Sequence, residues 1–275
     1  MRPPPNATSR PTAQSARRPF AVGLLAASLL VAGVAHAADP APAAPAAPPA
    51  PTALAVARKE NVERIGKELR RLCSSPRAAK ERVQIVTDLE SLVALGGADA
   101  ALATLEALAF DDEETEKKVF AFVETVRDKS LVKPLAAMVT DKDTRRRFRL
   151  HAQIAHAFSA IADVAALETL AELIGSEDAH VVAAAADACA IFKAAPHAKR
   201  VEPVKRLLEV FESTWNLKES RRPEDRIPTD EAKANWEVYG ASVRKGIQAL
   251  SGQSQLTRPR EFRDWWNDAK HATNW

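Results

Sequence analysis

The feature that most constrains the fold is a series of apolar residues at helical spacing, which begins near residue 53 and continues almost without interruption. The chain has no glycine between Gly97 and Gly175, and alanine, leucine, glutamate and lysine are abundant there. These residues lose little conformational freedom in a helix. The clusters of β-branched, aromatic and turn-forming residues that mark strands are missing. The sequence therefore predicts an all-α protein.

Nine apolar stripes follow one another before residue 212, each long enough for a short helix. They span Val62–Leu72, Ile85–Leu92, Leu102–Leu108, Val119–Val126, Leu131–Met138, Leu150–Ile161, Leu167–Ile174, Val182–Phe192 and Val204–Phe211. Breaks such as Ser74-Ser75-Pro76 and Gly96-Gly97 separate them by only a few residues. Short helices with short connections predict an array of αα-hairpins.

The hairpins repeat, because the middle of the chain matches itself after a shift of 35 residues. Three kinds of position agree: the apolar stripe, a turn aspartate and the stripe of the next helix. The matched pairs are Val119/Ile154, Val123/Phe158, Val126/Ile161, Asp128/Asp163, Leu135/Leu170, Met138/Leu173 and Val139/Ile174. A fixed period of this length is typical of solenoids, in which each helix pair buries its apolar face against its neighbours.

These residues resemble the HEAT-repeat family. The stretch 161–170 is similar to the family's turn and following helix, and so is 126–135, while Pro134 and Pro203 fall where HEAT repeats often carry proline. The turn aspartate is absent from the last full repeat, and the likeness covers roughly residues 78–214. Tetratricopeptide arrays have a similar period, but their expected bulky and small positions are not in place. The resemblance implies a right-handed α-solenoid of the armadillo-like type that binds other proteins.

The C-terminal part differs from the repeats because all five tryptophans lie after residue 214. Thr229 is a candidate N-cap for a helix ending near Leu250, and a last helix is expected from Pro259 to Trp275. A solenoid needs a terminal cap over its last repeat, and large aromatic residues suit that purpose. The segment is also similar to the tails of secreted bacterial HEAT-like proteins. We predict an aromatic helical cap.

The N-terminus has the pattern of an export signal. Four arginines and no acidic residue precede an apolar run from Phe20 to Val34, and Ala35-His36-Ala37 then supplies a small-x-small cleavage site. Cleavage is expected after Ala37. The apolar run is short for a membrane span of about 20 residues, although an uncleaved anchor is the alternative. Arg17-Arg18 partly resembles a twin-arginine signal, and the general secretory route is preferred.

Removing this signal changes the charge of the chain. The formal net charge is +3, and residues 1–37 carry four arginines and no acid, so the cleaved chain carries −1. A nearly neutral protein lacks the basic field that nucleic-acid binding requires. We expect no nucleic-acid partner, and no membrane association after cleavage. The oligomeric state is not predicted.

No motif of an enzyme, metal site or cofactor site is found. Glycine-rich phosphate loops, the Gly-x-Ser-x-Gly elbow and paired zinc-binding histidines are absent. Glu177 and His180 have the spacing of a carboxylate-bridged metal site, but no second such pair exists. Cys73 and Cys189 belong to distant repeats, so we expect two free thiols. The prediction is a protein without catalytic, cofactor-binding or metal-binding residues.

Two groups of residues are candidates for partner binding. Arg145, Arg146 and Arg147 form the most concentrated basic patch, which could receive an acidic peptide or a phosphate unless nearby acids neutralise it. Trp265 and Trp266 could anchor a partner or stack on sugar rings, or they could seal the end of the solenoid.

The sequence thus divides into a signal peptide (1–37), an Ala/Pro-rich linker (38–53), HEAT-like repeats (54–214) and a C-terminal cap region (215–275). We predict a periplasmic or secreted scaffold for a protein partner. The alternative is a carbohydrate- or cell-wall-binding module that uses the C-terminal tryptophans.

Overall fold

The computed structural model describes residues 53–75, 77–220, 226–272 and 275. The predicted signal peptide and all of the predicted linker except Ala53 lie outside these ranges. Within them the chain forms eleven α-helices, four short 3-10 helices and no β-strand. The predicted all-α class is confirmed for this part of the chain.

Each of the nine predicted apolar stripes lies in a helix or in a helix with its 3-10 extension. The first eight α-helices are α1 (Ala53–Cys73), α2 (Arg82–Leu95), α3 (Gly97–Thr104), α4 (Glu113–Val126), α5 (Val132–Thr140), α6 (Phe148–Ile161), α7 (Ala166–Ile174) and α8 (Ala179–Cys189). The 3-10 helices are η1 (Ala78–Lys80), η2 (Leu105–Ala109), η3 (Lys129–Leu131) and η4 (Ala190–Phe192). Most stripe residues are buried and form the core of this array, and Leu102, Val126, Met138 and Ile161 are partly buried against it.

The last three helices differ from the predicted bounds. They are α9 (His197–Lys218), α10 (Arg226–Ser251) and α11 (Pro259–Ala269). Helix α9 runs through the predicted boundary at 214/215. Thr229 lies inside α10 rather than at its N-cap, because the helix already begins at Arg226, and its Oγ1 is buried without a hydrogen-bond partner among the described residues. The last helix ends well before Trp275.

Aspartate side chains begin two of the helices. Asp112 accepts a hydrogen bond from the backbone N–H of Thr115 at 2.9 Å, and Asp178 accepts from Val181 at 3.1 Å. These carboxylates satisfy N–H groups that the first helical turn leaves without a partner. Sharp helix ends of this kind allow turns of only a few residues.

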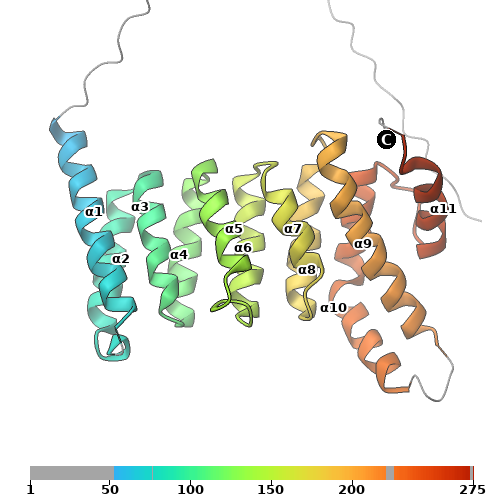
Figure 1. Cartoon of the computed structure of the whole chain (residues 1–275), viewed down its shortest axis with the longest axis horizontal. Helices are drawn as coiled ribbons and strands as arrows, with labels where there is room; N and C mark the ends of the chain where they lie inside the picture. The colour runs from blue at the N-terminus through green and yellow to red at the C-terminus, as the bar shows by residue number, and fades with distance from the viewer. Residues whose placement is uncertain (1–52, 76, 221–225, 273–274) are drawn as a thin grey trace, which may run out of the picture. The chain divides into compact units, whose positions relative to one another are not determined.

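The helices pack in two layers, and Figure 1 shows them side by side in chain order. In one layer α1 packs against α3, α5 against α7, and α7 against α9, with α11 also on α9. In the other, α2, α4, α6, α8 and α10 contact each other in succession. Most helix contacts therefore join elements one or two places apart in the chain.

Helix α10 approaches α8 closely because of a glycine. A Cβ atom on Gly246 would lie 2.9 Å from the carbonyl oxygen of Ala186, which is closer than van der Waals contact allows. None of the described helices combines the length and the apolar character needed to cross a bilayer.

Candidate functional site

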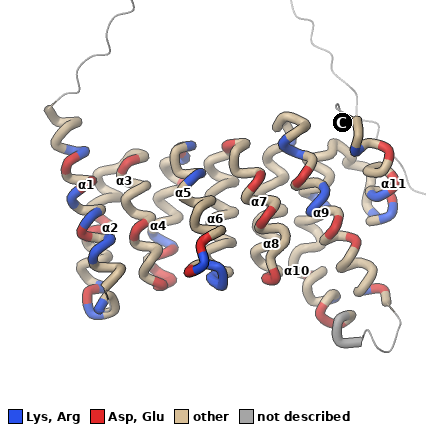
Figure 2. The backbone as a smooth tube through the Cα atoms, viewed as in Figure 1, with Lys and Arg blue, Asp and Glu red and all other residues tan. Residues whose placement is uncertain are grey.

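The basic run before α6 divides into two parts with different surroundings. Arg147 contacts one oxygen of the Glu116 carboxylate on α4, and the Nε of Arg149 lies 2.7 Å from the other oxygen. Arg147 also donates to the carbonyl oxygen of Leu108 at 2.5 Å and lies 3.3 Å from Asp111. Figure 2 shows acidic and basic residues next to each other along the turn between α5 and α6. Arg147 thus joins α6 to the preceding hairpin through both of its terminal nitrogens, while its Nε is buried without a hydrogen-bond partner among the described residues.

Arg145 and Arg146 remain on the surface. Both are exposed, and the described residues place no carboxylate within ion-pair distance of either side chain. They line a cavity of about 600 Å³ whose other wall includes Glu172 and Glu177. Two of the three predicted arginines are therefore available to a ligand.

His151 lines the same cavity from α6. Only 6% of the residue is exposed, and its Nε2 has no hydrogen-bond partner among the described groups. Burial lowers the pKa of this imidazole, and the positive charge of Arg147 lowers it further. A neutral histidine therefore stands beside the two exposed arginines.

Helix α7 presents acidic side chains on its outer face. Its apolar residues, among them Leu167, Leu170 and Ile174, are fully buried, so Glu168 and Glu172 point outward one turn apart. No ion pair to either carboxylate occurs in the described part of the chain. Like charges at this spacing repel each other mildly, so a cation placed between them would be favourable.

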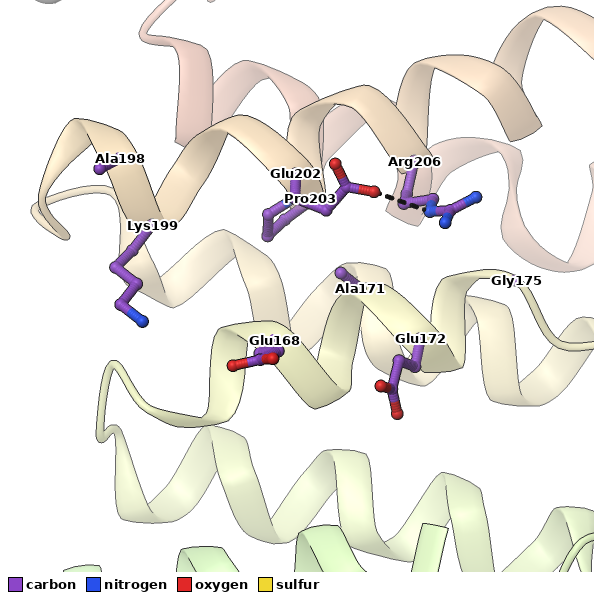
Figure 3. A pocket seen from close by; sticks show the side chains of 9 residues that line it. All are labelled: Glu168, Ala171, Glu172, Gly175, Ala198, Lys199, Glu202, Pro203 and Arg206. Atoms are coloured by element: carbon purple, nitrogen blue, oxygen red, sulfur yellow. Dashed lines mark ion pairs between the residues drawn. The ribbon is translucent and has the colours of Figure 1, made fainter. Parts of the chain in front are cut away.

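A groove of about 610 Å³ separates α7 from α9 (Figure 3). Glu168 and Glu172 line it from α7, with the carboxylate of Glu172 directed away from α9 in Figure 3, and Lys199, Glu202 and Arg206 line it from α9. Glu202 is paired with Arg206 at 3.0 Å. Ala171, Gly175 and Ala198 contribute little side-chain volume, which leaves the groove open.

Two further cavities adjoin this groove. One, of about 540 Å³, lies between α5 and α7 and is lined by Lys129 and Lys133 as well as both glutamates. The other is the cavity of Arg145 and Arg146. Glu172 lines all three, and we call this combined region the α7 surface. This surface was not predicted, because in a sequence the acidic residues of one helix cannot be distinguished from an ordinary solvent-exposed helix face.

The predicted tryptophan pair packs into an aromatic cluster. Trp266 is buried and Trp265 is half-buried, and their ring centroids lie 5.9 and 5.3 Å from that of Trp275. Arg200 on α9 donates to the carbonyl oxygen of Trp275 at 2.6 Å, and His197 packs edge-on against the same indole. These contacts join α11 and Trp275 to α9.

A second cluster lies near the other end of α9. Trp215 packs against Trp236 of α10 with centroids 5.1 Å apart, and Phe211 stacks on Trp236 at the same distance. Trp215 is half-buried and also lines a cavity beside the start of α11. Trp215 was not among the predicted binding residues, since nothing local in the sequence distinguishes it from the other four tryptophans.

Both cysteines are free thiols buried in the core. Burial raises the pKa of Cys73 to about 11 and raises that of Cys189 as well, so neither forms a thiolate at neutral pH. Among the described residues, no three histidine, cysteine or acidic side chains group in a way that could hold a metal ion.

No protein-family model matches the sequence of this chain, and no functionally characterised protein matches it.

Proposed function

We propose that this protein is an exported, HEAT-like α-solenoid that binds a partner protein on its α7 surface and has no catalytic activity. The proposal has three components: the solenoid, the partner site and export. Each has its own support.

The solenoid is supported by the spacing of equivalent helices. Helices α4 and α6 have the same length, and both their first and last residues are 35 positions apart. Arg127 and Ala162, which follow them, both adopt left-handed backbone conformations with φ of 54° and 58°. Asp128 and Asp163 then each accept a hydrogen bond at 2.8 Å from the backbone N–H two residues later. Equal helices with equal turns are what a right-handed stack of HEAT-like pairs requires.

Both ends of the array have features expected of the terminal caps of a solenoid. The outer side of α1 carries exposed charged residues, including Glu60, Glu63 and Arg64, so no apolar surface of the first helix needs a further neighbour there. The other end is covered by α11, whose Phe262 and Trp266 are buried. A polar first helix and an aromatic last helix would serve as terminal caps.

The main support for a partner site is the position of Glu172, which lines three adjoining cavities and has no ion pair among the described groups. The surface alternates acidic residues of α7 with basic residues of α5, α9 and the turn before α6. A partner segment with basic side chains opposite Glu168 and Glu172, and acidic ones opposite Arg145 and Arg146, would match this pattern. Mixed charges of this kind favour a protein partner over a uniformly charged polymer.

Export rests on residues 1–37, which lie outside the described part of the chain. We propose cleavage after Ala37 and a periplasmic or secreted protein. The first residue of the exported protein, determined by N-terminal sequencing, is expected to be Ala38; retention of residues 1–37 would contradict this component.

Site-specific photo-crosslinking tests the partner site. A photoreactive amino acid replaces Glu172 in the full-length chain, and in a second variant it replaces Glu63 on the outer side of α1. We expect position 172, and not position 63, to give a discrete cross-linked product in the compartment where the protein resides. The identified product is then purified for binding measurements.

Charge reversal provides the quantitative test. Glu168→Lys/Glu172→Lys should weaken binding of the cross-linked partner by at least tenfold, because it replaces two attractions by repulsions. Glu60→Lys/Glu63→Lys changes the net charge equally on α1 and should leave affinity unchanged. Equal effects of the two double variants would contradict a partner site on the α7 surface.

A further inference from the structure

A separate cavity of about 630 Å³ lies between the C-terminal part of α9 and the start of α11. We call it the Trp215 cavity. It contains one aromatic ring, three guanidinium groups, an amide and a carboxylate, which come from Trp215, Arg258, Arg260, Arg263, Asn216 and Glu212. This set differs from the lining of the α7 surface, which includes Phe148 beside Arg145 and Arg146 but no tryptophan and no asparagine.

The indole of Trp215 is held in place by its neighbours. Trp236 packs edge-on against it, and the ammonium group of Lys218 lies 4.4 Å from its ring centroid. A cation over the ring is attracted by the negative π face. The ring is only half-buried, so the remaining part that lines the cavity is a rigid apolar platform. Little conformational entropy is lost when a ligand stacks on such a platform.

The arginines around the platform differ in how strongly other residues hold their side chains. Arg263 forms a two-pronged ion pair with Glu212, one bond of which is 2.5 Å long. The side chain of Arg260 is 93% exposed, and its ion pair among the described residues is a 3.9 Å contact with Asp264. Arg258 is exposed, and none of the ion pairs among the described residues involves its guanidinium group. Arg258 and Arg260 therefore have guanidinium donors to offer an incoming anion.

We propose that the Trp215 cavity binds the uronic-acid units of an acidic polysaccharide. The C–H face of a pyranose ring carries partial positive charge and stacks on the negative face of an indole. A uronate carboxylate matches the paired donors of a guanidinium group. Asn216 offers both a donor and an acceptor to the hydroxyl groups. Each polar component of the sugar has a counterpart in the cavity.

A nucleotide is the main competing ligand, since its base also stacks on tryptophan and its phosphate also binds arginine. The carboxylate of Glu212 stands in the cavity wall, where it repels a phosphate dianion more strongly than a singly charged carboxylate. The amide of Asn216 also suits the many hydroxyl groups of a sugar. The cavity chemistry therefore favours a uronate.

Titration calorimetry on the exported protein tests the proposal with three probes: an oligomer of four galacturonic acid units, the same oligomer as its methyl ester, and uridine monophosphate. We expect the acidic oligomer to bind with a Kd below ~1 mM, and the uncharged ester to bind roughly tenfold more weakly. Absence of binding of the acidic oligomer at ~5 mM, equal binding of the ester, or tighter binding of the nucleotide would each overturn the proposal.

Variants locate the site. Arg258→Gln/Arg260→Gln should weaken binding of the acidic oligomer by tenfold or more, whereas Arg64→Gln/Lys67→Gln on α1 removes the same charge and should have no effect. Trp215→Ala should abolish binding, and Trp215→Phe should retain part of it because a smaller ring remains. The urea midpoint of each variant shows whether it is folded. Unchanged affinity in the Arg258/Arg260 variant would exclude this cavity as the site.

Discussion

Glu116 is the most deeply buried carboxylate of the described chain, with 2% of the residue exposed. Taking a carboxylate out of water is costly unless partners replace the solvent. Here Arg147 and Arg149 contact one oxygen each, and Arg147 is itself mostly buried. The three residues join the start of α6 to α4 and hold the turn that precedes α6.

Replacing Glu116 by glutamine keeps the shape of the side chain and removes its charge. We expect Glu116→Gln to lower the free energy of unfolding by about 3 kcal/mol, because Arg147 is left buried without its main counter-ion. Urea denaturation measures this. Glu114→Gln is the control, since Glu114 is 77% exposed and its pair with Arg82 should contribute less than about 0.5 kcal/mol. Similar losses in both variants would contradict the role of Glu116.

His151 makes stability depend on pH. Burial lowers its pKa in the folded protein, so as the pH decreases the unfolded chain takes up a proton at this residue before the folded protein does. Stability is therefore complete above about pH 6.5 and falls as the pH decreases below it. The contribution of this one group between pH 7 and 5.5 is at most about 1.4 kcal/mol.

His151→Asn should consequently lose less stability between pH 7 and 5.5 than the unmodified protein. The measurement is the difference in urea midpoints at the two pH values. Other groups that titrate in this range contribute to both proteins and cancel in the comparison. His156→Gln, which removes an exposed imidazole from the same helix, controls for loss of a histidine as such. An equal or larger pH dependence in His151→Asn would refute the assignment.

At the scale of elements, the ends of α4 and α6 show how short turns are made. Both helices are followed by a residue in the left-handed conformation, Arg127 and Ala162, where glycine is the usual choice. A side chain with a Cβ atom is strained there by about 1–2 kcal/mol. The aspartate that follows each of them, Asp128 or Asp163, begins the next turn by accepting a backbone hydrogen bond.

Ala162→Gly should therefore stabilise the protein by about 0.5–1 kcal/mol, even though glycine has more freedom in the unfolded chain. Ala162 is exposed, so no packing is lost. Ala160→Gly, inside α6, should instead destabilise by up to about 1 kcal/mol. Urea midpoints with unchanged m-values would establish both signs. Destabilisation by Ala162→Gly would show that its backbone is not strained.

For the molecule as a whole, the pattern of helix–helix contacts determines how far the destabilising effect of a mutation spreads. Most helices touch only helices one or two places away in the chain, so local damage at one end has few direct contacts with the other. Trp266, buried on α11, and Leu69, fully buried on α1, lie at opposite ends of the array.

Trp266→Ala should lower the free energy of unfolding of the C-terminal end of the array by about 3–5 kcal/mol. We expect hydrogen exchange to become faster in α9–α11 and to stay unchanged in α1–α3, with the reverse pattern for Leu69→Ala. Leu54→Ala is the control, since Leu54 is 84% exposed and should change neither end. Uniformly faster exchange along the chain would indicate a single cooperative core and would weigh against the solenoid.

The sequence by itself determined the helical class and the location of the first nine helices, because the burial of one stripe per helix is a local, periodic requirement. It also identified the residues that join the turns, such as Asp128 and Asp163. It did not determine the start of α10, since a helix can begin with a weak local signal when it is supported by packing against α8 and α9.

Only the tertiary structure decided which side chains remain available. Arg145 and Arg147 are two positions apart in one basic run, yet Arg147 is held by Glu116 from another hairpin and Arg145 faces an open cavity. Trp266 is buried against Trp275, while Trp215 lines a cavity with arginines from α11. Availability depends on partners far apart in the chain, and no local pattern records them.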